Sequence, residues 1–184
     1  IKDAANRYLY DEDDGFYYDR CAATDKLIKV KTPASLLPLF AGFCDKKRAD
    51  SIITKHLFNT DEFFTPFPVP SLAKNEEKFD GSIHRGASHP YFAYFTALAL
   101  LDYGYKKEAQ KVMADVVSNI ARQYENSGVL YEFYDSRSVV SPSKIKCTGE
   151  APFAYIPEIK RVNIRDYGVT AAVFAEIIMM LYRL

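Results

Sequence analysis

The chain has 184 residues, which is enough for a single domain or for one large piece of a bigger domain. Its 24 Lys and Arg residues balance 24 Asp and Glu residues, so the formal net charge is zero. Without a basic surface field to hold phosphates, nucleic acid is excluded as an expected partner. Hydrophobic residues make up 48% of the chain and charged residues 26%, proportions that predict a folded protein rather than a disordered one.

The chain contains 14 Tyr and 13 Phe but no Trp. Flat rings in such numbers suit either a site that grips polar rings or a packed core. The three cysteines, Cys21, Cys44 and Cys147, have no CxxC spacing and no clustered His partners. This pattern argues against a zinc site or a disulfide framework and favours buried free thiols.

Two further features concern membranes and targeting. The longest apolar run, Val173–Leu181, is interrupted by Glu176 and is far shorter than the roughly 20 residues that span a bilayer, so no membrane segment is predicted. The first ten residues begin with Ile and lack the basic and then apolar order of a signal peptide. We therefore expect the N-terminus to be internal to a longer polypeptide, and the sequence assigns no compartment.

Hydrophobic periodicity, caps and breakers predict six helices. In chain order they cover residues 3–10, 32–43, 45–57, 90–103, 105–126 and 168–184. Pro33 stands at the first position of the second helix, where its missing N–H costs nothing, and Pro38 predicts a kink inside that helix. Because short turns join neighbouring helices, we expect antiparallel helical hairpins.

The segments between the helices predict only small extended elements. Residues 15–20 and 27–31 suit a short hairpin, and residues 129–134 suit a short strand that opens after Gly128. The run FFTPFPVPS at 63–71 has three prolines in five residues, so it predicts a rigid extended loop of the kind that borders a site. From residue 135 to 165 the chain is too irregular for a helix. The sequence thus predicts an all-α protein, about half of a helical toroid, with very short strands in its loops.

Six sequence motifs occur in a fixed order along the chain. They are DGFYYD at 14–19, KTPASLLPLFAG at 31–42, FFTPFPVPS at 63–71, HRGASHPYFAY at 84–94, YEFYDS at 131–136 and DYGVTAAVF at 166–174. In this order they resemble the C-terminal half of (α/α)6-toroid glycoside hydrolases of the trehalase and family 63 glucosidase type. The resemblance implies that residues 1–184 are the C-terminal part of such a catalytic domain, as a fragment.

The resemblance also implies an inverting hydrolase with two carboxyl groups. One protonates the leaving glycosidic oxygen and the other activates water on the opposite face of the sugar, with a separation of roughly 6.5 to 9.5 Å between them. By its place in LYEFYD, Glu132 corresponds to the general base. Partial desolvation between Tyr131 and Phe133 would make it a better base. The alternative is that Glu132 is merely the exposed position of an alternating strand.

The general acid has no counterpart in this sequence, because the resemblance places it in the first half of the toroid. Asp13, Asp14 and Asp19 flank an aromatic run, but DEDDG is more typical of a solvated helix end and turn, so no acid is assigned.

The sugar-binding positions depart from the family pattern. Where the pattern has Trp on both sides of Arg85, this chain has His84 and His89, and where a third Trp is expected it has Val169. Losing these stacking faces costs about 1 to 2 kcal/mol each. Both His residues are expected to titrate near neutrality and to bond sugar hydroxyls, but without a third ligand they predict no metal site. Arg85 suits either a sugar subsite or a surface ion pair.

Further candidates for the sugar pocket are the aromatic residues Tyr17, Phe67, Tyr94 and Tyr167, each of which suits core packing equally well. The sequence therefore predicts a glycoside hydrolase fragment that acts on an α-glucosidic or related bond, carries Glu132 and Arg85, requires no cofactor and is inactive alone. The alternative is an inactive carbohydrate-binding or scaffolding fragment completed by another chain. Self-association is predicted through an apolar edge made by Ala4, Ala5, Tyr8, Ile177, Ile178 and Leu181.

Overall fold

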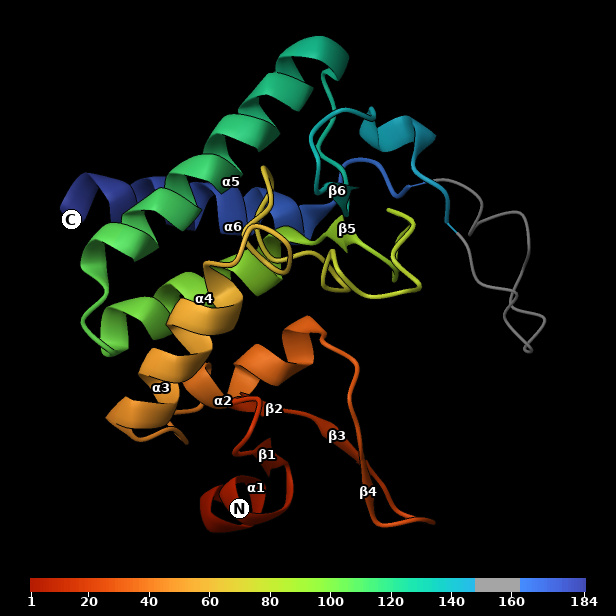
Figure 1. Cartoon of the computed structure of the whole chain (residues 1–184). Coiled ribbons are helices and arrows are strands. Elements are labelled where there is room, and N and C mark those ends of the chain that lie inside the picture. The colour runs from red at the N-terminus through yellow and green to blue at the C-terminus, as the bar shows by residue number, and fades with distance from the viewer. Residues whose placement is uncertain (148–162) are drawn as a thin grey trace.

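A computed structural model describes residues 1–147 and 163–184 and confirms an all-α fold with short strands (Figure 1). The α-helices of the described ranges are α1 (Lys2–Tyr8), α2 (Leu37–Phe40), α3 (Lys46–Ile52), α4 (Pro90–Asp102), α5 (Lys106–Ser127) and α6 (Gly168–Arg183). Shorter 3₁₀ turns cover Pro33–Leu36 and Pro142–Lys144, and a π-helical turn covers Ile53–Leu57. Part of the irregular stretch predicted up to residue 165 lies outside the described residues.

The strands form three separate antiparallel pairs. They are β1 (Tyr10–Asp11) with β2 (Phe16–Tyr17), β3 (Asp19–Cys21) with β4 (Lys26–Ile28), and β5 (Ala87–Ser88) with β6 (Tyr134–Asp135). No sheet within 1–147 and 163–184 has more than two strands. The predicted hairpin at 15–31 is confirmed as β3 and β4, whose register joins Arg20 to Leu27.

The strand predicted over residues 129–134 is wrong. Tyr131 forms an isolated bridge with Arg165, whereas Tyr134 pairs with Ser88 in the ladder of β5 and β6. Because the two ends of the run pair with different segments, the chain bends at Glu132 between them instead of continuing as one strand.

The helix predicted over residues 32–43 is interrupted. It begins as a 3₁₀ turn at Pro33 and becomes α-helical only from Leu37 to Phe40. Pro38 lacks the N–H that a continuous helix would use, so the chain changes helix type there, at the site of the predicted kink. The next helix starts where predicted, because the Asp45 carboxylate accepts a hydrogen bond of 2.8 Å from the Arg48 backbone N–H.

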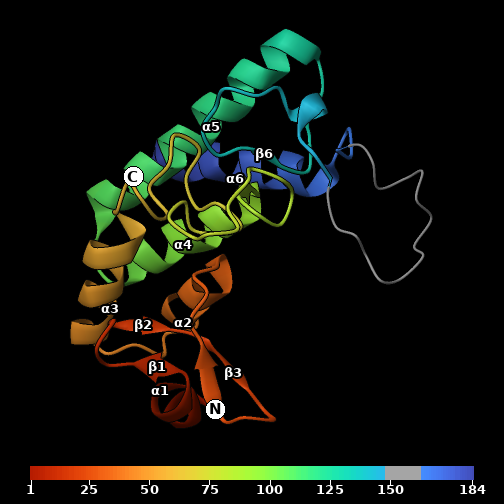
Figure 2. The same ribbon diagram turned by 45° about the vertical axis from the view of Figure 1, so that its right-hand side comes forward.

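The helices predicted over 90–103 and 105–126 are confirmed as the antiparallel hairpin of α4 and α5 (Figure 1). Gly104, with φ of 84°, makes the turn between them, and Gly128 ends α5 in the left-handed conformation. Helix α6 packs against both α4 and α5. Figure 2 shows these three helices together at one end of the molecule and α1 with the first strands at the other end.

Five large aromatic side chains fill the core. Phe16, Phe63, Phe67, Phe133 and Tyr134 are all fully buried. Of the two roles that the aromatic composition allows, packing thus accounts for these five rings.

The proline-rich segment crosses from the first half of the fold to β5, β6 and α5. The Phe67 N–H donates to Ser136 O at 2.8 Å, and the Ser71 N–H donates to Ala87 O at 2.8 Å. Pro70 bridges Ser88, so the segment extends the β5 and β6 ladder on one side. The predicted rigid loop therefore borders the segments that carry the HRGASHP and YEFYDS motifs.

A buried charged cluster holds the start of this proline-rich segment. Glu62 accepts from Lys31 Nζ at 2.6 Å and from Asn75 Nδ2 at 3.3 Å, and its other oxygen lies 2.7 Å from His56 Nδ1. Glu62 and His56 are each only 4% exposed. Such a cluster stabilises the fold only while every member keeps its partner.

We predict that Glu62→Ala lowers the free energy of unfolding by about 3 to 5 kcal/mol, because it leaves the partly buried Lys31 ammonium and the buried His56 without their shared partner. Urea denaturation measures this change. Glu77→Ala is the matched control, since Glu77 is exposed and its loss should change stability by less than about 0.5 kcal/mol. Equal effects in the two variants would contradict the role given to the cluster.

The structure corrects part of the predicted apolar edge. Ile177 is fully buried and Ala5 is 9% exposed, so neither is available for association. Both views place α1 and α6 far apart, so their residues cannot form one patch (Figure 2). Helix α6 still exposes Ile178, Met179 and Tyr182, because its other face alone packs on α4 and α5. In the described ranges, no helix has the length and apolar character needed to cross a bilayer.

Self-association therefore stays a prediction that now rests on α6. We expect light scattering to give a mass above that of one chain, and the double variant Ile178→Lys and Tyr182→Lys to give the mass of one chain, because both side chains are exposed. A wild-type protein that remains monomeric at high concentration would contradict this expectation.

Candidate functional site

The candidate site forms where three distant segments meet. The ladder of β5 and β6 joins the HRGASHP motif to the YEFYDS motif through the pairs Ala87 with Asp135 and Ser88 with Tyr134. On the other side, the Glu132 N–H donates to Ile164 O at 3.1 Å and the Tyr167 N–H donates to Leu130 O at 3.1 Å. Backbone pairing alone thus brings the last three sequence motifs together.

Side chains reinforce this pairing around Glu132. The amide of Asn163 donates from Nδ2 to Phe133 O at 2.6 Å and accepts from the Phe133 N–H at 3.4 Å, as a neighbouring strand would. Thr170 Oγ1 donates to Tyr131 O at 2.8 Å. Tyr131 and Phe133 are buried and Glu132 is half-buried, so the backbone fixes the carboxylate at the boundary of the core.

The Glu132 carboxylate lies near partly buried titratable side chains. Burial raises the pKa of the Tyr91 hydroxyl, and the neighbouring Tyr167 and Glu132 raise it further. Burial likewise raises the pKa of the Cys147 thiol, and the Glu132 carboxylate adds to that effect. The Glu132 carboxylate is therefore near enough to Tyr91 and Cys147 to act on both electrostatically, and Tyr167 acts on the same Tyr91 hydroxyl.

Arg85 lies on an exposed turn beside this cluster. Its N–H donates to Ser82 O at 3.0 Å, and its own carbonyl accepts from the Asp80 and Gly81 amides. The guanidinium lies 4.0 Å from the Asp80 carboxylate, with about half of each side chain exposed. Gly86 follows with φ of 125°, and a Cβ there would lie 2.4 Å from the Phe79 ring, so only glycine fits.

His89 is an almost fully buried polar residue of the cluster. It is 3% exposed and its ring lies among those of Tyr91, Phe92 and Phe133, with centroid distances of 5.4, 6.1 and 5.5 Å. Nε2 donates to Ile83 O at 3.2 Å, which leaves Nδ1 as a buried acceptor with no partner in the described structure. Burial lowers the pKa of His89 to about 4.

Comparison with known proteins identifies the family. The model of the mannosylglycerate hydrolase MGH1-like glycoside hydrolase domain matches residues 1–138. The chain belongs to this glycoside hydrolase family. The matched range includes Arg85, His89 and Glu132.

Individual relatives agree with this assignment. The cytosolic neutral trehalase of Neurospora crassa is 27% identical over 147 residues, which cover 77% of this chain and 20% of the trehalase. An uncharacterised protein of Borreliella burgdorferi is 29% identical over 102 residues, 54% of this chain and 21% of that protein. The glycoside hydrolase chain thus spans about a fifth of the length of the curated relatives it matches.

Solved structures place the chain in the (α/α)6 toroid fold. The GH63 mannosylglycerate hydrolase of Thermus thermophilus, solved in complex with glucose, has a TM-score of 0.60 and 27% identity over 71% of this chain and 32% of that chain. Neutral trehalase of Saccharomyces cerevisiae has a TM-score of 0.69 and 14% identity, and the match covers 97% of this chain and 28% of the trehalase. At this low identity, the match is evidence for the fold alone. The helices described above are therefore part of such a toroid.

The glycoside hydrolase chain brings some of its sequence-predicted residues together and separates others. His89, Tyr167 and Glu132 belong to one cluster, with Arg85 and the exposed His84 on the adjoining turn. Tyr94 lies on α4, half-buried, with its ring 5.7 Å from that of Phe95. Val169 is exposed near the start of α6.

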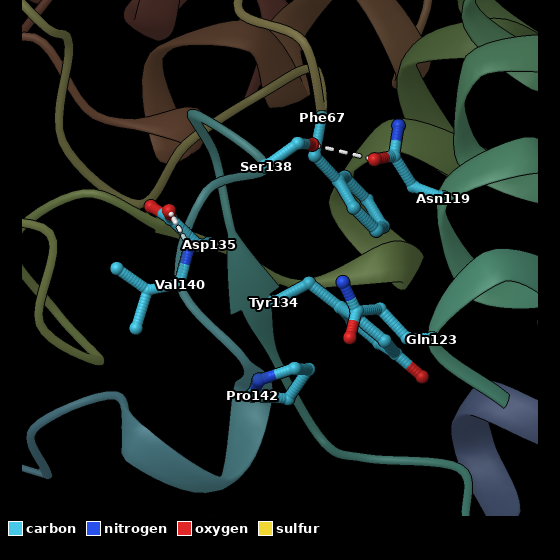
Figure 3. Close-up of a pocket in the computed structure, with 8 residues that line it drawn as sticks. All are labelled: Phe67, Asn119, Gln123, Tyr134, Asp135, Ser138, Val140 and Pro142. Atoms are coloured by element: carbon cyan, nitrogen blue, oxygen red, sulfur yellow. Dashed lines mark hydrogen bonds between the residues drawn. The ribbon is translucent and has the colours of Figure 1, made fainter. Parts of the chain in front are cut away.

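Tyr17 and Phe67 occupy the core. Tyr17 is 2% exposed, its hydroxyl donates to Asn6 Oδ1, and Cys44 Sγ lies 3.6 Å from it. Phe67 stacks on Tyr134 at 5.1 Å in a depression beneath α5 that encloses no space for a water molecule (Figure 3). Tyr17 and Phe67 therefore pack in the core, which is one of the two roles that the sequence allowed, and neither lies beside a space large enough for a sugar ring.

The aspartates near the N-terminus lie away from this cluster. Asp14 accepts from the Tyr18 hydroxyl in the turn after β1, at the end of the molecule opposite α5 and α6 (Figure 1). Across residues 1–147 and 163–184, no three His, Cys, Asp or Glu side chains gather as a metal site.

Sequence reasoning missed Tyr91 and Asn163. Tyr91 stands inside the HRGASHPYFAY motif, so its position next to His89 was the available signal. Nothing in the sequence marks Asn163, because its role depends on the pairing of two segments 30 residues apart.

The sequence expectation that His89 titrates near neutrality is wrong. We predict a nuclear magnetic resonance titration midpoint near pH 4 rather than near the ordinary 6.5, because burial disfavours the imidazolium. Since the unfolded chain binds the proton first, stability falls as the pH falls from about 6.5 towards 4, by about 2 kcal/mol between pH 7 and pH 5. His89→Phe should lose this part of the pH dependence, with exposed His84→Phe as the control.

Proposed function

We propose that residues 1–184 form the C-terminal part of the catalytic domain of an inverting glycoside hydrolase, with Glu132 as its general base. The observation that carries the proposal is the placement of Glu132. Its backbone is fixed on both sides by pairing to other segments, while the residue stays half-buried near Tyr91 and Cys147. A general base must be held in a fixed position and be partly shielded from solvent. Backbone pairing provides the fixed position of Glu132, and its half-buried location provides the shielding.

In the proposed reaction, Glu132 takes a proton from a water molecule as the water oxygen attacks the anomeric carbon. The glycosidic oxygen leaves from the opposite face of the sugar with a proton from a carboxylic acid. That acid must lie roughly 6.5 to 9.5 Å from Glu132 to leave room for the water. We propose that a segment outside this chain supplies it, so the chain alone should not turn over substrate.

The substrate class we propose is an α-linked glucosyl unit or a related sugar. The relatives named trehalase and mannosylglycerate hydrolase support a carbohydrate ligand, as does the glucose complex of the Thermus thermophilus neighbour. Within this chain, Arg85 offers a fork of donors to sugar hydroxyls from its exposed turn. His89 is too deeply buried to meet a sugar directly, and we propose that its bond to Ile83 O holds the turn that carries Arg85.

A second candidate function is carbohydrate binding without hydrolysis. It is favoured by the changed sugar-binding positions, where His84, His89 and Val169 stand in place of the tryptophans of the family pattern. The two candidates differ in one requirement, because hydrolysis needs a second carboxyl group opposite Glu132 and binding does not.

The test uses the polypeptide that supplies both halves of the toroid, either a longer natural chain or this chain mixed with a first-half fragment. We expect Glu132→Gln to lower kcat about 100-fold to 10,000-fold, with sugar binding retained, because only proton transfer is lost. Glu125→Gln, at an exposed position of α5, is the control and should leave kcat unchanged.

Two further measurements decide the mechanism. Proton resonances of the first product should show the β-anomer from an α-linked substrate, and azide should restore turnover to Glu132→Gln by attacking the anomeric carbon in place of water. Retention of configuration, or full activity of Glu132→Gln, would rule out the proposed base. Sugar binding with no hydrolysis in the completed toroid would favour the second candidate.

A further inference from the structure

A second concave site lies on the side of the β5 and β6 ladder that carries Asp135. It encloses about 180 Å³ and is lined by Asp80, Gly81, Ser82, Asp135, Arg137, Val140, Lys144, Ile145 and Lys146. It shares Asp135 and Val140 with the depression drawn in Figure 3 but has the open volume that the depression lacks. Neither Glu132 nor Tyr91 lines it, so this basic pocket is separate from the candidate site for hydrolysis.

Two lysines of the basic pocket have no opposing charge in contact. Lys144 and Lys146 are exposed and form no ion pair within residues 1–147 and 163–184. Ile145 between them is 6% exposed and packs with Phe133 and Ala87. Because Ile145 is anchored in this small core, its two neighbours are both held at the rim of the pocket.

The third cation, Arg137, is held in place from two sides. Its Nε donates to Asp135 Oδ1 at 3.2 Å, and Asp135 also accepts the N–H groups of Val139 at 3.0 Å and Val140 at 2.8 Å. On the other side, the Arg137 guanidinium passes over Gly81, where an added Cβ would lie 2.7 Å from Nη2. The absence of a side chain at Gly81 therefore allows Arg137 to reach across the pocket.

A buried hydroxyl in the pocket wall lacks a partner. Ser82 is 2% exposed, and its Oγ makes no hydrogen bond in the described structure. Its backbone N–H is already used, since it donates to Asp80 Oδ1 at 2.8 Å. Buried hydroxyls are almost always bonded. The Ser82 hydroxyl lies close enough to the Asp80 carboxylate to influence the pKa of that carboxyl, and it can donate to an acceptor that a ligand brings into the pocket.

We infer that the basic pocket binds a small oxyanion, a carboxylate or a phosphate group. Three cations and two carboxylates line it, which leaves one positive charge in excess, and Arg137 already compensates the buried Asp135. The Lys144 and Lys146 ammonium groups, the free guanidinium nitrogens of Arg137 and the Ser82 hydroxyl all donate hydrogen bonds, as an oxyanion requires. The inference does not depend on the proposed hydrolysis, because binding of the anion requires neither Glu132 nor a sugar.

The test is a titration of the purified chain with inorganic phosphate and, separately, with acetate, at constant ionic strength in chloride. Amide resonances of residues 80–82 and 137–146 should shift and saturate. Tighter saturation by phosphate identifies a phosphate ligand, and tighter saturation by acetate identifies a carboxylate ligand. Absence of saturable shifts with both anions would overturn the inference.

Variants distinguish a built site from general attraction to a surface. The double variant Lys144→Gln and Lys146→Gln, and separately Ser82→Ala, should each weaken the binding by about tenfold or more. Lys107→Gln is the matched control, since Lys107 is an exposed lysine on α5 outside the pocket, and it should change nothing. Equal losses in the control and the pocket variants would overturn the inference. If Ser82→Ala fails to fold, the two exposed lysines decide the outcome.

Discussion

The arrangement of both sites depends on the backbone pairing of one buried run, residues 131–136. Its residues pair with β5, with the segment from 163 to 167, and with the proline-rich segment through the bond from Phe67 N–H to Ser136 O. Tyr131, Phe133, Tyr134, Asp135 and Ser136 are all buried. Buried backbone N–H and C=O groups need hydrogen-bond partners, and the three neighbouring segments supply them.

Glu132 is the exception in this run, and its position follows from the pairing. The bridge from Tyr131 to Arg165 and the pair of Tyr134 with Ser88 lie on either side of it, and the chain bends between them. The bend places the carboxylate at the surface of a core that would not otherwise accept a charge. The same geometry explains why a regular strand does not form there.

The other end of the run organises the basic pocket by a different means. Asp135 is buried and accepts three backbone amides and the Arg137 Nε, so its charge tightens the turn from 135 to 140. This turn positions the Arg137 guanidinium against Gly81. The run 131–136 therefore carries the half-buried Glu132 carboxylate near one end and the buried Asp135 carboxylate near the other. Backbone pairing positions both, and Asp135 in turn holds Arg137 at the basic pocket.

The sequence by itself determined the helices, the fold family and the motifs. Helix α5 could be read from its periodicity and from Gly128, because these signals are local. The interruption at Pro38 follows equally from one residue. Only the tertiary structure decided which aromatic residues pack and which surround Glu132, since Tyr17 and Tyr167 look alike in sequence and differ in burial. The same holds for His89, whose low pKa comes from the rings around it, and for the partners of Asn163 and Ser82, which depend on contacts between distant segments.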